Sequence, residues 1–191
     1  RILAFHIVSQ IGYLLLGIAL MSPAGAAATV FFTLHNILVK SALILIAGLV
    51  WRLAGHHDLR RVGGLYPARP GLALLFFLAA FALVGVPPTS GFWGKFLLVT
   101  ASFDAERYLW GGVALAVGVL TLYSMLKIWL EAFWKPHPDG LDPARALPGL
   151  GPAYVATTLL VAGSLVMGLW PEPFIAGIQA ATAGFGPPAS P

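Results

Sequence analysis

The chain has 191 residues, of which 59% are hydrophobic and only 9% are charged, and its formal net charge is +4. Soluble domains carry about 25% charged residues, so this chain has too few polar side chains to cover a globule in water. No basic face indicates nucleic-acid binding, and the absence of cysteine excludes disulfides and thiolate metal sites. The composition therefore predicts an all-α, polytopic helix bundle in a lipid bilayer.

We expect about five membrane crossings, because about 20 apolar residues cross the hydrocarbon layer. The third crossing is expected to be discontinuous, running over residues 72–86 and resuming over 92–103. The uninterrupted crossings are expected at residues 2–21, 27–53, 109–134 and 152–170.

The chain then divides into two expected regions. Residues 1–171 form the membrane domain, and residues 172–191 form a surface segment, centred on a weakly amphipathic stretch at 174–183, followed by a disordered tail. Residue 1 is Arg rather than Met, so we interpret the chain as part of a longer protein.

Positive charges predict the orientation, because cytoplasmic loops are enriched in Lys and Arg. With five crossings, Arg107 lies alone on one side, and the other side receives Arg1, Arg52, Arg60, Arg61, Arg69, Lys135 and Arg145. We therefore expect a multi-pass protein of a bacterial cell membrane, with the amino end cytoplasmic and the carboxyl end outside.

The discontinuous crossing is interrupted by the run GVPPTSGFWGK at residues 85–95. The break frees backbone groups that lipid cannot satisfy, so it must be buried in protein or face water. Its residues include two prolines, two hydroxyls that we expect to bond the freed backbone, and a conformationally free glycine: Pro87, Pro88, Thr89, Ser90 and Gly91.

Lys95 follows the break directly. We expect it beside the positive amino end of the resumed helix, where its cationic form is disfavoured. An ionisable group at membrane depth indicates a functional site. The alternative is a proline kink with a lysine that extends to the membrane surface.

The second crossing carries a polar stripe, in which Thr29, Thr33, Asn36 and Lys40 are spaced 4, 3 and 4 residues apart. Such a stripe suits a hydrated proton path, since burial makes the neutral form of a lysine accessible. The alternative for Lys40 is a structural polar contact or ion pair between helices.

His35 lies about 140° from Lys40 around a regular helix. It is expected to reach a second polar cluster, or to be turned inward by a local bulge. Its titration near physiological pH suits proton relay, and the alternative is a structural histidine bonded to a neighbouring carbonyl.

Other polar residues leave two interpretations open. Lys127 either pairs with Glu131, one turn later, or forms the cytoplasmic exit of a path. Ser9, Gln10 and Tyr13 in the first crossing are either contacts between helices or ligands of water. The adjacent His56, His57 and Asp58 lack a second cluster at metal-ligand spacing, so we expect no metal site.

Several runs together resemble one family of membrane proteins. They lie at residues 1–13, 34–40, 58–65, 85–96 and 122–129. They are similar to the antiporter-like subunits shared by respiratory complex I, membrane-bound hydrogenases and Mrp-type Na+/H+ antiporters. The spacing of His35 and Lys40, the residues of the break and the Lys-Ile-Trp run favour the Mrp branch, and within it the D-type subunit. The resemblance covers residues 1–171.

The resemblance implies roles for three residues. Lys40 corresponds to the central proton-transfer lysine of the family's second half-channel, Lys95 to the terminal lysine that exchanges protons with the outside, and His35 to a relay between them. The family contains inverted repeats, and this chain matches most of the second repeat and the end helix. The chain alone is therefore not expected to exchange ions.

The predicted function is a proton-conducting subunit of a multisubunit cation/proton antiporter, whose partners are the other subunits, the bilayer, protons and Na+. No pattern for flavin, iron–sulfur or nucleotide is present, so no cofactor is expected. The alternatives are the complex I or hydrogenase version of the subunit, a self-contained solute carrier, and a purely structural membrane anchor.

Overall fold

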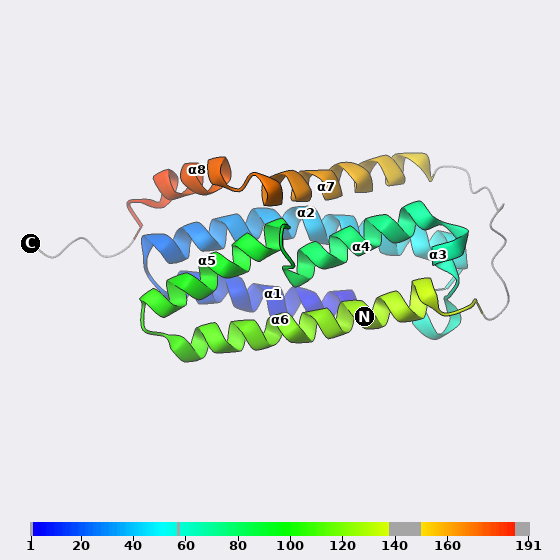
Figure 1. Ribbon diagram of the computed structural model, residues 1–191, viewed down its shortest axis with the longest axis horizontal. Coiled ribbons are helices and arrows are strands. Elements are labelled where there is room, and N and C mark those ends of the chain that lie inside the picture. The colour runs from blue at the N-terminus through cyan, green and yellow to red at the C-terminus, as the bar shows by residue number, and fades with distance from the viewer. Residues whose placement is uncertain (1, 57, 138–149, 186–191) are drawn as a thin grey trace, which may run out of the picture.

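The computed structural model describes residues 2–56, 58–137 and 150–185, and every regular element in these ranges is helical. The long helix α2 (Pro23–Ala54) packs against most of the others (Figure 1). The remaining elements, in chain order, are α1 (Ile2–Ala19), η1 (Leu59–Arg61), α3 (Leu65–Ala68), α4 (Pro70–Val84), α5 (Ser90–Asp104), α6 (Tyr108–Ile128), the π-helical segment η2 (Trp129–Trp134), α7 (Gly151–Leu169) and α8 (Glu172–Thr182).

Local sequence sets the bounds of α2. Ser22 caps its amino end, where the side-chain Oγ accepts a hydrogen bond from the Gly25 amide at 3.1 Å, and Pro23 occupies the first turn. At the other end Gly55 adopts a left-handed conformation with φ 76° and closes the last turn. With 32 residues, α2 is about 48 Å long and extends beyond a hydrocarbon layer of about 30 Å.

The expected membrane bundle is confirmed. Within the described residues, three helices are long and apolar enough to cross a bilayer, namely Pro23–Ala54, Tyr108–Trp134 and Gly151–Leu169, and two shorter apolar helices cover Phe5–Ala19 and Pro70–Val84. The half-helices α4 and α5 have 15 residues each, or about 22 Å, so neither crosses alone. They lie end to end beside α2, with the break near the middle of the bundle (Figure 1).

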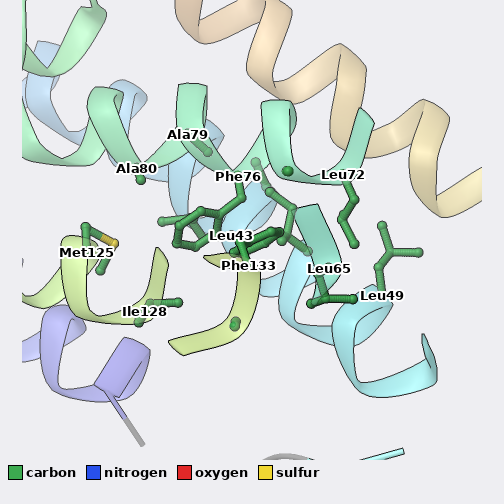
Figure 2. Close-up of a cluster of buried hydrophobic side chains, with 14 of the residues drawn as sticks. Leu43, Leu49, Leu65, Leu72, Phe76, Ala79, Ala80, Met125, Ile128 and Phe133 are labelled. Atoms are coloured by element: carbon green, nitrogen blue, oxygen red, sulfur yellow. The ribbon is translucent and has the colours of Figure 1, made fainter. Parts of the chain in front are cut away.

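The larger apolar core joins α2, α4 and the end of α6 (Figure 2). Phe76 lies at its centre beside Leu43 and stacks on Phe133 with ring centroids 4.7 Å apart. A second cluster, around Phe32 and Leu98, joins α1, α2, α5 and α6. Large apolar side chains such as Leu109 and Leu159 are exposed, which suits a surface facing lipid or other subunits.

The segment after the last crossing forms helix α8, which packs against α2 and contains no buried residue. It begins two residues earlier than the expected amphipathic stretch. The tail at 186–191, expected to be disordered, lies outside the described residues.

Candidate functional site

Helix α4 ends at a glycine in the left-handed region of the backbone map. Gly85 has φ 90°, and its amide and that of Val86 both donate to the Phe81 carbonyl, at 3.0 and 3.1 Å. The carbonyls of Leu83 and Val84 in the last turn then need other donors.

Lys95 supplies those donors. Its Nζ donates to the Val84 carbonyl at 2.6 Å and to the Leu83 carbonyl at 3.0 Å, and lies 5.5 Å above the centre of the Tyr13 ring. The expectation that Lys95 lies beside the positive amino end of α5 is therefore wrong. Helical side chains point toward the amino end of their own helix, so the ammonium passes the first turn of α5 and reaches the negative carboxyl end of α4.

The two hydroxyls of the break bond different partners. The Thr89 Oγ1 donates to the Val86 carbonyl at 2.7 Å, as expected for a residue that satisfies the freed backbone. Ser90 does not do so. Its Oγ lies 2.8 Å from Nδ1 of His35 and 2.7 Å from Oγ of Ser164 on α7.

His35 reaches a second polar cluster without any bulge, because α2 is regularly α-helical around it. Its side chain is 0% exposed, and Nδ1 is held by Ser90 while Nε2 has no partner among the described protein groups. Gly91 makes this approach possible, because a Cβ there would lie 2.8 and 3.0 Å from two atoms of the imidazole and would meet the Ala82 carbonyl.

The second part of the break, Thr89 to Gly91, is buried, whereas Pro87 and Pro88 are exposed. Helix α7 packs against this buried part. Gly168 lies so close that a Cβ would meet the Ser90 amide at 2.5 Å and the carbonyl of Pro88. The indole N–H of Trp93 donates to the Gly168 carbonyl at 2.9 Å. Pro87 and Pro88 form the outer turn of the break.

Two side chains of the polar stripe of α2 donate hydrogen bonds to backbone carbonyls of the same helix. Thr33 donates to the Thr29 carbonyl and Asn36 Nδ2 to the Phe32 carbonyl, each at 2.8 Å. Lys40 is half-buried, and no ion pair or hydrogen bond joins its ammonium to another described residue. Within the described chain, the structural ion pair considered for Lys40 is not formed.

Lys127 and Glu131 do not pair, contrary to one of the two interpretations. Glu131 instead binds Lys135, with Oε2 2.9 Å from Nζ. This pair also spans four residues and has the more favourable order, with the glutamate before the lysine. Lys135 also donates to the Arg60 carbonyl at 3.0 Å and so attaches the loop to η2. Lys127 is exposed and lines a cavity of about 740 Å³ beside that loop.

The loop residues considered as metal ligands have other partners. Asp58 caps η1 by accepting from the Arg60 amide at 3.0 Å and pairs with the Arg60 side chain at 3.2 Å. The backbone N–H of Arg60, and then its side chain, lower the pKa of the Asp58 carboxyl. His57 lies outside the described residues, and the described residues contain no group of three or more His, Cys, Asp or Glu that could hold a metal.

The sequence did not point to Ser164, and it left Gln10 undecided. Ser164 shares one buried face of α7 with Thr157, Val161 and Gly168. Their spacing of 4, 3 and 4 residues is visible in the sequence and indicates this buried face. Gln10 lies on the buried face of α1, between His6 and Tyr13. The Tyr13 hydroxyl donates to the Ala114 carbonyl, so this tyrosine joins α1 to α6.

The bundle and its site define a class, a polytopic membrane protein with half-buried amines beside a discontinuous helix. The sequence model described as NADH:quinone oxidoreductase/Mrp antiporter, TM, matches residues 1–123. The chain belongs to this family, as the sequence predicted.

Relatives lie in both branches of the family. The chain is 41% identical, over 91% of its length, to the D-type subunit of the Na(+)/H(+) antiporter of Alkalihalophilus pseudofirmus. It is 33% identical, over 92% of its length, to the N-type subunit of the F(420)H(2) dehydrogenase of Methanosarcina mazei. It covers 35% and 37% of those two proteins, so it spans about a third of their length.

Two solved structures share the fold. The Mrp complex of Dietzia sp. matches 98% of the chain and 42% of the matched subunit, with TM-score 0.86 and 34% identity. Respiratory complex I of Thermus thermophilus matches 94% of the chain and 37% of the matched subunit, with TM-score 0.81 and 27% identity.

Proposed function

We propose that this chain is the proton-conducting part of a subunit in a multisubunit cation/proton antiporter, with Lys40, His35 and Lys95 as proton-transfer groups. The observation that carries the proposal is the position of Lys95, whose ammonium is held by the last carbonyls of α4 at the break of a membrane crossing. Ionisable groups at such depth are costly and mark ion paths.

His35 and Lys95 both lie at the break, where the imidazole meets Gly91 and the Lys95 side chain meets Gly85. Lys40 follows His35 on α2. His35 presents Nε2 without a protein partner, while Nδ1 is held by Ser90. A proton on one lysine raises the cost of a proton on the next, because charges interact strongly where water is scarce. Loading one group therefore drives release from another.

Thr33 and Asn36 line the same side of α2 as Lys40, and we assign them to the path. Lys127 is assigned to its cytoplasmic opening, because it is exposed beside the loop that follows α2. The clustering of basic residues in that loop and at Lys135 supports a cytoplasmic location for this end of the bundle, in a bacterial cell membrane.

The names of the relatives support Na+ as the exchanged cation and other antiporter subunits as partners, since the 41% identical relative is a subunit of a Na(+)/H(+) antiporter. A second candidate is a proton-pumping subunit of a complex I-type assembly, which is favoured by the match to respiratory complex I. Antiporter genes beside this one, or genes for quinone-site and iron–sulfur subunits, would separate the two.

The test uses the full-length protein in its assembled complex, in membrane vesicles that report a pH gradient. Lys40→Ala and Lys95→Ala are each expected to abolish most proton transport without removing the protein from the membrane. Normal transport in both variants would reject the proposal and favour a structural anchor. Dependence of the pH response on added Na+ tests the choice of cation.

A further inference from the structure

A cavity of about 740 Å³ lies where α2, the end of α6 and the loop after α2 meet. Leu43 on α2, Phe76 on α4 and Phe133 on η2 form part of its wall (Figure 2). This volume falls within the range of about 300–1,000 Å³ that is typical of small-molecule pockets in proteins. The cavity therefore has room for a ligand, and its lining decides which kind.

The walls that the helices contribute are apolar. Ile46, Ala47 and Val50 continue the α2 wall, and Ile128 lines the cavity from α6. A polar group placed against such walls would lose its hydrogen bonds to water and gain none in return. The part of the ligand that lies between the helices must therefore be hydrocarbon.

These walls lie at the depth of lipid acyl chains. From Phe76 to Gly85, at the break, α4 rises about 13 Å. The break lies near the middle of the bundle (Figure 1), and half of the hydrocarbon layer is about 15 Å thick. The loop after α2 lies beyond the end of that helix, at the depth of the lipid headgroups.

The polar part of the lining has an uncompensated positive charge. Its residues are His56, Asp58, Arg60 and Lys127. Asp58 and Arg60 pair with each other at 3.2 Å, so their charges offset. Glu131 is bound to Lys135, and this leaves the Lys127 ammonium without an anionic partner among the described residues. The cavity therefore combines hydrocarbon walls with a site for an anion.

We propose that this cavity binds an anionic phospholipid, with one acyl chain between α2 and α6 and the phosphate at Lys127 and an imidazole N–H of His56. Phosphate accepts charge-assisted hydrogen bonds from a lysine ammonium, and basic pockets between membrane helices bind acidic lipid headgroups. Ile44 and Leu130, beside the cavity lining on α2 and η2, are 58% and 48% exposed, so the surface around the cavity is apolar.

Other occupants fit this lining less well. A soluble anion would satisfy Lys127 but would leave the apolar walls uncovered. A lipid with no net charge would cover the walls but would leave the charge of Lys127 uncompensated. An anionic phospholipid satisfies both parts of the cavity. The inference does not depend on proton transfer, because lipid binding is measured directly.

The test uses the full-length protein in its assembled complex, in phosphatidylcholine nanodiscs. These contain a trace of phosphatidylglycerol with a photoreactive diazirine on one acyl chain. After irradiation, mass spectrometry of peptides should find the label on residues 43–50 of α2 and on η2. An excess of unlabelled phosphatidylglycerol should remove this labelling, whereas the surrounding phosphatidylcholine does not.

Two pairs of variants test the two parts of the cavity. Lys127→Gln should lower the labelling about fivefold, as expected for one basic charge lost near anionic lipid, and Lys127→Arg should keep it. The control for charge is Arg61→Gln, which removes an exposed arginine outside the lining and should have a much smaller effect. Ala47→Phe fills the apolar part and should abolish the labelling, whereas Ile44→Phe, outside the lining, should not.

Three results would overturn the inference. The first is equal labelling by a photoreactive phosphatidylcholine. The second is labelling that Lys127→Gln leaves unchanged, and this exposed position decides the matter even if Ala47→Phe does not assemble. The third is a cross-link from a photoreactive amino acid in place of Ala47 to another segment of the full-length chain or to a partner subunit, which would mean that protein fills the cavity. None of these results changes the proposed function, which rests on transport by the Lys40 and Lys95 variants.

Discussion

The ammonium of Lys95 lies 2.6 Å from the carbonyl oxygen of Val84, the last residue of α4. A single side chain from the second half-helix thus completes the hydrogen bonding of the first. The same lysine has a structural task, as donor to two carbonyls, and a proposed chemical task, as carrier of a proton. Different substitutions separate these tasks.

Lys95→Met should lower the free energy of unfolding by about 1–3 kcal/mol, because it leaves two carbonyls without their donor. Lys95→Arg keeps the donors, but a guanidinium does not release its proton, so transport should be lost while stability is largely kept. Denaturant unfolding in detergent, followed by tryptophan fluorescence, measures the first effect and vesicle assays the second. Lys127→Met, which removes an exposed lysine, is the stability control. Active Lys95→Arg would exclude proton release at this position.

Gly91→Ala should disturb the break, since the added methyl meets the His35 ring and the Ala82 carbonyl. Overpacking of this kind costs about 1–3 kcal/mol, and it displaces the imidazole from Ser90. Gly48→Ala is the matched control in a helix interior, because nothing lies within 4 Å of its added Cβ, and it should stabilise by about 0.5–1 kcal/mol. Thermal unfolding of the two purified variants makes the comparison. Equal stability would mean that the approach of His35 to Gly91 is not tight.

Ser90→Ala should destabilise the protein more than Ser164→Ala. The first leaves His35 Nδ1 buried without a partner, at a cost of about 1–3 kcal/mol, whereas the second removes one neutral bond worth about 0.5–1.5 kcal/mol. A double-mutant cycle should show coupling between the two sites. Thr158→Ala, which removes an exposed hydroxyl bonded to its own helix, should have little effect. Additive losses would indicate that the two serines act independently.

Lys135→Ala should loosen the loop before α3, because Lys135 joins Glu131 to the Arg60 carbonyl. The ion pair is partly exposed, so its own contribution is no more than about 1 kcal/mol. Limited proteolysis of the loop at residues 55–64 should be faster in this variant. Lys127→Ala should leave the cleavage rate unchanged, and equal acceleration in both variants would contradict the assigned pairing.

The crossings and the break were predictable because they depend on local chemistry. Uninterrupted apolar runs define the crossings, and Ser22, Pro23 and Gly55 fix the ends of α2 by capping. Paired prolines beside glycines locate the break. The sequence also separated His35 from the stripe of Lys40 correctly, because a regular helix fixes that angle.

The hydrogen-bond partners of the site residues were harder to predict from the sequence. Ser164 lies 74 residues after Ser90, and no local pattern joins them. The position of the Lys95 ammonium depends on the direction of its side chain rather than on its place in the sequence. Glu131 has a lysine four residues away on each side, so the spacing alone does not select Lys135 over Lys127. The unpaired state of Gln10 depends on how α1 packs on α2.

The contact of Gly168 with the break has a mechanical consequence. The end of α7 packs directly against residues 88–90, and the Trp93 indole donates to the carbonyl of the same glycine. We expect the broken crossing to behave as a rigid scaffold and not as a hinge. A change of charge at the site would then be accompanied by changes of side-chain rotamer and by rearrangement of water. The backbone of the two half-helices would keep its position.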